Sequence, residues 1–284
     1  MPKVLSEAQV AAYHRDGYLF PLRAMETARM RTVRERFDAL CLREGGALGK
    51  HMNTKPHLLV TWLADLVRHG AVLDAVEHLI GPNLLCWGAG FFHKPAHAPD
   101  FVSWHQDSTY WGLSRPDVVT AWIAFTPSLP LSGCMRVVPG SQAKDQLAHR
   151  DTFAGHNMLS RGQEVDVEVD PAEAVDIVLQ PGEFSLHHVR IVHGSEPNRA
   201  DWPRVGFAIR YIPTDIRQLS EVRDSATLVR GHDAFGNFEP EPAPQSDFHP
   251  DAVAFHNKVI ARTTQILLAG AVNKREGTAT RTIT

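Results

Sequence analysis

The stretch Leu84-Leu85-Cys86-Trp87-Gly88-Ala89-Gly90-Phe91-Phe92 decides the fold class of this 284-residue chain. It follows a break at Gly81-Pro82 and is a short, largely apolar run with the length of a buried strand. Similar short runs, separated by Gly, Pro, Ser and Asp, recur downstream at 118–125, 135–138, 176–179, 183–187 and 205–211. Many short strands with Gly and Pro turns predict a sandwich or barrel, of which the jelly roll is one form.

The residues before this stretch predict helices instead. Ser6 is a good N-cap for a helix that ends near Gly17. Apolar residues at helical spacing predict a second helix over 24–44 and a third over 62–80. The boundary near residue 82 does not have the composition of a linker. We therefore expect one domain over 1–284, in which residues 1–82 are a mainly helical support for a β core over 83–213.

Two polar segments interrupt or follow the core. Residues 144–172 predict an insertion across one end of the core, and residues 231–251 contain four prolines. The second segment predicts a long loop that is either a lid or merely mobile. Residues 214–284 would thus consist of this loop and a C-terminal helix over 252–271, with a frayed end over 274–284.

Composition excludes several classes of protein. The formal net charge is −3 and no run of about 18 apolar residues occurs, which argues against nucleic-acid binding and against a membrane span. The N-terminus turns polar too early for a signal peptide. The three cysteines are far apart and form no CxxC, so we expect a reducing, cytoplasmic setting.

A candidate metal site begins at Trp104-His105-Gln106-Asp107. In an extended segment, His105 and Asp107 project to the same face, where an imidazole and a carboxylate can bind one divalent metal. A second histidine would complete a 2-His-1-carboxylate face, which leaves three open positions on an octahedral iron(II). Taken alone the pair is weak, because the chain contains 16 histidines.

The second histidine is sought near residue 190. His187 and His193 share one strand parity, whereas His188 and Arg190 share the other. His193 precedes Gly194, and a ligand at a strand end beside a turn is plausible. The alternative is that His187 and His188 line the pocket and His193 is a surface residue. Periodicity leaves both readings open.

Arg204 precedes a β run, and an arginine that faces inward on such a strand needs a partner. A carboxylate is its best partner. If a dicarboxylate cosubstrate chelates the metal, Arg204 can bind its distal carboxylate. The alternative is a surface salt bridge with Asp201 or Glu196.

The combination resembles the phytanoyl-CoA dioxygenase family, which includes ectoine hydroxylase and related iron(II)- and 2-oxoglutarate-dependent oxygenases. The resemblance covers roughly residues 5–213 and departs from the family at Gln142, where a histidine is common. Several motifs match in order: Leu5-Ser6, Asp16-Gly17-Tyr18, Trp104-His105-Gln106-Asp107, Ala121-Trp122, Ser132-Gly133, Pro139-Gly140-Ser141, His193-Gly194-Ser195 with Pro197-Asn198, and Arg204 eleven residues after His193.

This resemblance implies a mainly β fold, in which a double-stranded β-helix (a cupin-like jelly roll) packs against N-terminal helices. It implies Fe(II), 2-oxoglutarate and O2, with His105, Asp107 and His193 as the iron ligands. Arg204 would bind the 5-carboxylate of 2-oxoglutarate, with Ser195 as a hydrogen-bond partner and Trp122 as a wall of that pocket. The strand before His105 matches the family only loosely, and Lys94 is a further candidate residue there.

The implied activity is hydroxylation of an unactivated C–H of a small polar metabolite (amino-acid-like, ammonium- or phosphonate-bearing), with release of succinate and CO2. Related halogenases lack the carboxylate ligand, so Asp107 favours oxygen transfer. The alternatives are a natural-product tailoring oxygenase of the same family, a non-catalytic cupin-like protein that binds metal or 2-oxoglutarate, and a zinc hydrolase.

The substrate is the least determined part. Tyr110 and Trp111 follow the metal motif and are candidate pocket walls, and Trp111 could also bind a cation. Arg190 is the first candidate for binding an anionic group, with Arg115 and Arg136 behind it. Packing positions are equally open for Tyr110 and Trp111, and a surface position is equally open for Arg190. We expect a small-molecule partner. The sequence is compatible with a homodimer, and it leaves open the carbon attacked, the stereochemistry and the number of oxidations.

Overall fold

The computed structural model describes residues 4–268, and its core is a jelly roll built from two main sheets, as the sequence predicts. The predicted frayed end at 274–284 and the last three residues of the predicted C-terminal helix lie outside the described residues. The helices are α1 (Glu7–Asp16), α2 (Thr27–Arg43), α3 (Thr61–Leu66), α4 (Gly70–Ile80) and α5 (Pro250–Leu267). The strands are β1 (Tyr18–Arg23), β2 (Leu84–Lys94), β3 (Val102–His105), β4 (Val119–Ala124), β5 (Met135–Val137), β6 (His149–Asp151), β7 (Gln163–Val165), β8 (Val175–Asp176), β9 (Glu183–His188), β10 (His193–Ser195), β11 (Arg204–Pro213), β12 (Ser225–Arg230) and β13 (Glu239–Pro240).

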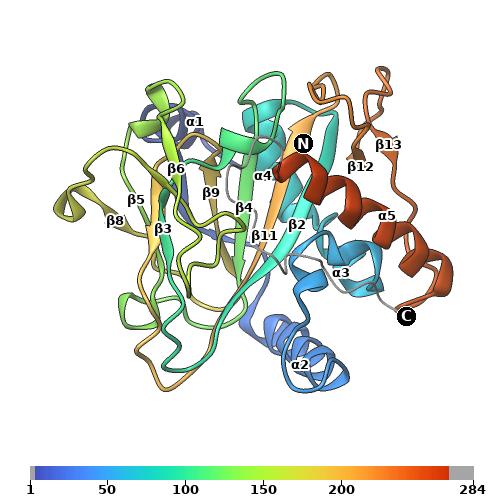
Figure 1. Cartoon of the computed structure of the whole chain (residues 1–284), viewed down its shortest axis with the longest axis horizontal. Coiled ribbons are helices and arrows are strands. Elements are labelled where there is room, and N and C mark those ends of the chain that lie inside the picture. The colour runs from blue at the N-terminus through green and yellow to red at the C-terminus, as the bar shows by residue number, and fades with distance from the viewer. Residues whose placement is uncertain (1–3, 269–284) are drawn as a thin grey trace.

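The larger sheet has the strand order β1-β9-β4-β11-β2-β12-β13, and the smaller sheet has the order β3-β10-β5-β8. Figure 1 shows the smaller sheet on one side of the larger one, and helices α2 and α3 on the other side. Apolar side chains of β4, β5 and β11, among them Trp122, Met135 and Ala208, pack between the two sheets. The site described below lies in this same interior.

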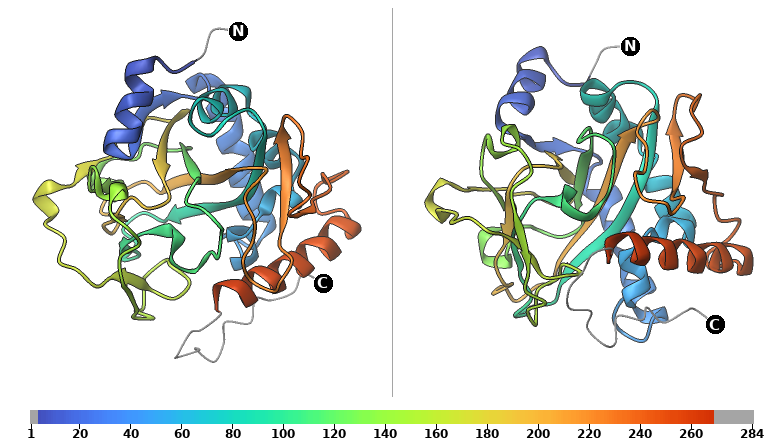
Figure 2. Two further views of the ribbon diagram at one scale, coloured as in Figure 1. Left: turned by 90° about the horizontal axis from the view of Figure 1, so that it is seen from above. Right: turned by 45° about the horizontal axis from the view of Figure 1, so that its top comes forward.

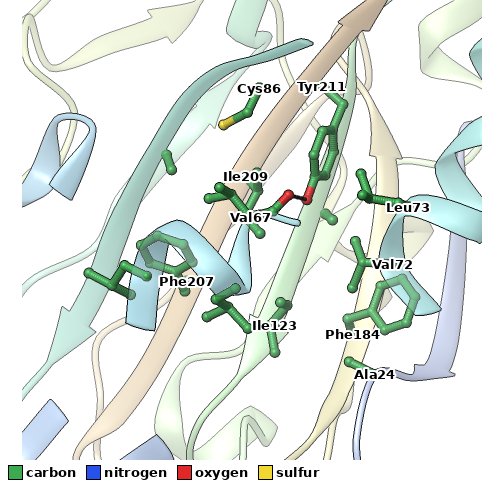
Figure 3. Packing of buried hydrophobic residues seen from close by; sticks show 14 of the residues in the cluster. Ala24, Val67, Val72, Leu73, Cys86, Ile123, Phe184, Phe207, Ile209 and Tyr211 are labelled. Carbon is green, nitrogen blue, oxygen red and sulfur yellow. Dashed lines mark hydrogen bonds between the residues drawn. The ribbon is translucent and has the colours of Figure 1, made fainter. Parts of the chain in front are cut away.

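The strand β11 shows why the sheet has two different faces. Val205, Phe207 and Ile209 point toward the helices and join the main hydrophobic cluster, which Figure 3 shows around Tyr211 and Leu73. The alternate residues Arg204, Ala208 and Arg210 point into the interior between the sheets. Successive side chains of a strand project to opposite faces. One strand therefore supplies both the core and the site.

The helices largely follow the prediction. Ser6 caps α1 through Gln9, and Gly17 ends it with a φ of 87°, as expected. The predicted helix over 62–80 is two helices, because the chain turns at His69 and restarts at Gly70. Strand β1 was missed within the helical region. It is a six-residue segment with Pro21 at its centre and lies at the edge of the sheet, where a missing N–H is tolerated.

The two polar segments have distinct roles. The insertion at 144–172 contains an antiparallel pair, β6 and β7, of which β7 lies beside β3. The loop at 231–251 contains β13 and packs at the far edge of the larger sheet, where Figure 2 shows it beside α5. Its Phe238 and Glu241 are buried, and none of its residues lines the interior cavity. Among the described residues, no helix is long and apolar enough to cross a membrane.

Candidate active site

Two histidines from neighbouring strands face each other in the smaller sheet. His105 on β3 pairs with His193 on β10, and their ring centroids are 4.1 Å apart. The Nδ1 atom of each ring lies about one hydrogen-bond length from the carbonyl two residues before it, at 2.9 Å from Ser103 and 3.0 Å from Ile191. Donation from Nδ1 fixes the tautomer in which Nε2 carries the lone pair, the state that binds a metal.

Asp107 completes the triad. Gln106 is extended, and Asp107 begins a short 3-10 helix (Asp107–Tyr110) with its backbone N–H donated to the carbonyl of Val189. Its Oδ1 lies 3.3 Å from Nε2 of His105. One ligand atom from each of His105, Asp107 and His193 lies within 4.8 Å of the others, a spacing at which the three residues could bind one metal ion.

The residue between His105 and Asp107 holds these two side chains in place. Gln106 is fully buried, and its amide nitrogen donates to the carbonyl of Arg190. Its amide oxygen accepts from the side chain of Gln146 and from the backbone N–H of Leu147. The insertion therefore clamps the segment that carries His105 and Asp107.

The ionisation states suit a metal. Burial and the neighbouring His105 hold the pKa of His193 well below its ordinary value, so its imidazole is neutral. Burial opposes ionisation of Asp107, but the adjacent His105 and the positive charge of Arg210 outweigh it and hold the pKa of this carboxyl below its ordinary value. Neutral imidazole and ionised carboxylate are the forms that bind metal.

Arg204 is buried in the same cavity without a carboxylate partner. Only 2% of its surface is exposed, and its Nε and Nη2 atoms have no hydrogen-bond partner in the described part of the chain. The alternative partner Asp201 is instead at the surface, 2.9 Å from His97. Burial lowers the pKa of Arg204 to about 10, which still leaves it charged near neutral pH. A buried unpaired guanidinium is costly, and a ligand carboxylate would complete it.

Lys94 and Trp122 flank this arginine. Lys94 is opposite Arg204 on β2, and its Nζ lies within hydrogen-bond distance of Oγ of Ser195 (2.7 Å) and of the carbonyl oxygens of Ser195 (3.3 Å) and Glu196 (2.5 Å). Burial and the charge of Arg204 lower the pKa of Lys94 to about 6. The ring of Trp122 lies 5.4 Å from the guanidinium carbon of Arg204. It covers Gly206, where a Cβ would fall 1.8 Å from the ring, so the glycine makes room for it.

One cavity joins these groups. It contains about 420 Å³ of space outside the protein atoms. Both sheets contribute to its walls, which place Trp122, Ser195 and Arg204 in the same cavity as the triad. The lining residues are Phe92, Val102, His105, Asp107, Thr120, Trp122, Met135, His187, His193, Gly194, Ser195, Arg204, Ala208 and Arg210.

The structure does not bring the expected substrate residues into this cavity. The hydroxyl of Tyr110 donates to Asp151, and the guanidinium of Arg161 lies 3.6 Å from the centre of its ring. Trp111 packs against Trp87 with their ring centroids 4.9 Å apart. The 3-10 helix that starts at Asp107 is the reason, because it turns the following side chains away from the metal site.

The expected anion-binding arginines also lie elsewhere. Arg190 is 3.6 Å from Asp145, Arg136 is paired with Asp176, and Arg115 is paired with Asp117 and Asp215. None of them lines the cavity.

Three polar residues were overlooked or left undecided. Thr120 and Arg210 line the cavity, and so does His187, which the sequence leaves as an open alternative to His193. The alternation of side chains along β11 could have indicated Arg210, because Arg210 lies six residues after Arg204 and therefore on the same face of the strand.

Two imidazoles beside a carboxylate suit non-haem iron(II), and the unpaired guanidinium suits the far end of a dicarboxylate that chelates this metal. A jelly-roll oxygenase that depends on iron(II) and 2-oxoglutarate is the class of protein that this arrangement defines.

Comparison with known proteins identifies the family. The profile of phytanoyl-CoA dioxygenase (PhyH) matches residues 4–206. A solved non-heme monooxygenase, ThoJ in its apo form, is 34% identical, and the match covers 92% of this chain and 98% of that chain with a TM-score of 0.81. CytC3, solved with Fe(II) and alpha-ketoglutarate, is 25% identical over 84% of this chain and 99% of that chain, with a TM-score of 0.62.

A curated relative from Stutzerimonas stutzeri, a probable alpha-ketoglutarate-dependent hypophosphite dioxygenase, is 31% identical over 163 residues. This match spans 56% of this chain and 56% of the relative's length. Since the family profile spans most of the sequence, the chain belongs to the phytanoyl-CoA dioxygenase family. This membership agrees with the resemblance that the sequence motifs indicate.

Proposed function

We propose that the protein hydroxylates an unactivated C–H of a small polar metabolite that is amino-acid-like or bears an ammonium or phosphonate group. The reaction would consume one O2 and one 2-oxoglutarate, insert one oxygen atom into the C–H bond, and release succinate, which contains the other, and CO2. His105, Asp107 and His193 would bind the iron. The single observation that carries the proposal is the buried, unpaired Arg204 in the same cavity as the triad.

Each residue of the site would have its own role in binding the metal and the cosubstrate. Bound iron(II) would supply the redox chemistry that activates O2. Arg204 would bind the 5-carboxylate of 2-oxoglutarate, with Ser195 as hydrogen-bond partner and Trp122 as wall. Lys94 would hold the Ser195 hydroxyl in place, since its Nζ is 2.7 Å from this oxygen. The apolar side chains between the sheets would exclude water from the remaining space.

A small substrate is supported by the cavity itself. The space between the protein atoms, about 420 Å³ with its opening to solvent included, must accommodate both cosubstrate and substrate. A polar substrate is supported by Thr120, His187 and Arg210, which line the same space. The relative named as a hypophosphite dioxygenase acts on a small polar compound, in agreement with this choice.

The test is an anaerobic titration of metal-free protein with iron(II) and then 2-oxoglutarate. We expect the weak visible charge-transfer band of a chelated 2-oxo acid in wild type and no band in His193→Ala. Lys258→Ala, on α5 and outside the cavity, is a matched control that should retain the band.

A folded, metal-loaded wild type without the band would refute the 2-oxoglutarate assignment and favour a zinc hydrolase. A band without substrate-dependent succinate release across a broad metabolite panel would favour a non-catalytic binding protein. Turnover confined to large secondary metabolites would favour natural-product tailoring.

A further inference from the structure

Three polar side chains form one row across the cavity-facing surface of the larger sheet. Arg210 on β11 pairs with Thr120 on β4, and Thr120 pairs with His187 on β9. All three line the cavity. Residues that pair across adjacent strands project to the same face, so the row is a direct consequence of strand register. We call it the β11-β4-β9 row.

Each member of the row has a buried polar atom with no partner in the described part of the chain. These atoms are Oγ1 of Thr120, Nδ1 of His187 and Nε of Arg210. Thr120 and His187 are 1% and 3% exposed. Buried polar groups are nearly always hydrogen-bonded in folded proteins. Three unsatisfied groups side by side in a cavity therefore point to a ligand that satisfies them.

The guanidinium of Arg210 is held in position. Its carbon lies 5.3 Å from the centre of the Trp111 ring. Trp111 packs against Trp87, whose Nε1 donates to Asp224 at 2.6 Å. On the other side, Arg210 pairs with Gly88, which has no side chain to fill the space. Trp111, a candidate for binding a substrate cation, instead stacks on a cation of the protein itself.

Arg210 also has no carboxylate partner of its own. No ion pair within 4.0 Å joins it to any described residue, although its charge lowers the pKa of Asp107. Arg204 and Arg210 are six residues apart on one face of β11, which separates their backbones by about 20 Å. The cavity thus has two cationic ends, and the cosubstrate requires only one of them.

We propose that the β11-β4-β9 row binds an anionic group of the primary substrate, either a carboxylate or a phosphorus oxyacid. This inference rests on the proposed function and narrows its substrate class. Amino-acid-like and phosphonate-bearing compounds carry such a group, whereas a compound whose only charge is an ammonium group does not. Arg210 supplies the charge and two or more donors, Thr120 supplies a hydroxyl donor, and His187 supplies a ring nitrogen.

The test uses oxygen-free protein loaded with Fe(II) and saturating 2-oxoglutarate. Methylphosphonate and acetate are titrated as anionic probes, with acetamide as the neutral probe, and binding is followed through the charge-transfer band and by calorimetry. We expect the wild type to bind at least one anion more tightly than acetamide. Arg210→Met should weaken this binding roughly tenfold or more, and Thr120→Val a few-fold. The dissociation constant of 2-oxoglutarate should stay within about twofold in both variants.

The matched control is Arg115→Met, which removes a surface arginine paired with Asp117 and Asp215 and should change neither constant. Thr120→Val, which keeps the shape of the side chain, replaces the first variant if Arg210→Met does not fold.

Anion binding equal to that of acetamide in wild type, or unchanged in both row variants, would overturn the inference. If Arg210→Met weakens 2-oxoglutarate binding as much as Arg204→Met does, Arg210 belongs to the cosubstrate site and the inference fails while the proposed function stands. If wild type forms no 2-oxoglutarate complex, the proposed function itself fails.

Discussion

The two faces of strand β11 differ in role: one packs in the hydrophobic core, and the other faces the cavity. On the helix-facing side, Val205, Phe207 and Ile209 are fully buried among apolar neighbours. On the cavity side, Arg204 and Arg210 have buried nitrogen atoms without partners among residues 4–268. Burial stabilises the first face and penalises the second. One face of the strand therefore contributes to the stability of the fold and the other to ligand binding. Substitutions on the helix-facing side should mainly lower the free energy of unfolding, whereas substitutions on the cavity side should mainly weaken binding.

The largest expected effect on activity comes from Asp107→Ala. Removal of the carboxylate leaves two histidines, so we expect iron(II) binding to weaken strongly and substrate-dependent succinate formation to fall by about a thousandfold or more. Anaerobic metal titration and a succinate assay measure these effects. His188→Ala, a neighbouring histidine outside the cavity, is the control. Full turnover in Asp107→Ala would remove this residue from the ligand set.

The largest expected effect on stability comes from the helix-facing side. Phe207→Ala removes a buried aromatic ring from the main cluster and should lower the free energy of unfolding by about 3–5 kcal/mol. Urea unfolding measures the change, and Phe207→Leu should cost clearly less. A loss below about 1 kcal/mol would mean that this face does not carry the core.

Arg204→Met, on the cavity side, should weaken cosubstrate binding without lowering the stability of the fold. We expect the apparent KM for 2-oxoglutarate to rise by one to two orders of magnitude, because a charged hydrogen-bond pair is lost. The same change removes a buried unpaired charge, so the ligand-free protein should melt at an equal or higher temperature. Steady-state kinetics and thermal unfolding measure the two effects. A lower melting temperature together with an unchanged KM would assign Arg204 to the structure alone.

The smallest expected effect is a pH dependence of 2-oxoglutarate binding that arises from Lys94. Lys94, with its pKa near 6, is mostly neutral above that pH in the free protein. A bound dianion beside it raises this pKa, so binding of 2-oxoglutarate should take up part of a proton and weaken as the pH rises above 6. Calorimetry in buffers of different ionisation enthalpy measures the uptake. Lys94→Met should abolish it, and an uptake that persists in this variant would assign the proton to another group.

Local spacing was enough for several features of the fold. The apolar runs predicted β2, β4, β5, β9 and β11, and Ser6 and Gly17 marked the ends of α1 correctly. Strands β12 and β13 were not predicted, because they lie in the segment 214–284 that was expected to contain only a loop and a helix. The helix predicted over 62–80 was wrong in the middle, because a periodic apolar pattern continues through the turn at His69. Strand β1 carried no clear pattern of its own, since its neighbours in the sheet come from much later in the chain.

The sequence likewise indicated some residues of the candidate site correctly and others wrongly. The motifs around His105 and His193, together with Arg204, rest on residues a few positions apart, and the structure brings these side chains into one cavity. Tyr110 and Trp111 seemed equally near, but a single turn of 3-10 helix directs them elsewhere. Sequence adjacency therefore did not predict which side chains face the substrate.

The sequence by itself predicted the strand-rich core from local apolar spacing and indicated the family from its motifs, and the candidate ligands His105, Asp107 and His193 followed from that family resemblance. Only the tertiary structure decided that Arg210, Thr120 and His187 form one row and that Arg190 is not part of the cavity. The physical reason is register: β4, β9 and β11 are distant in sequence, and their alignment is set by the packing of the whole sheet against the helices.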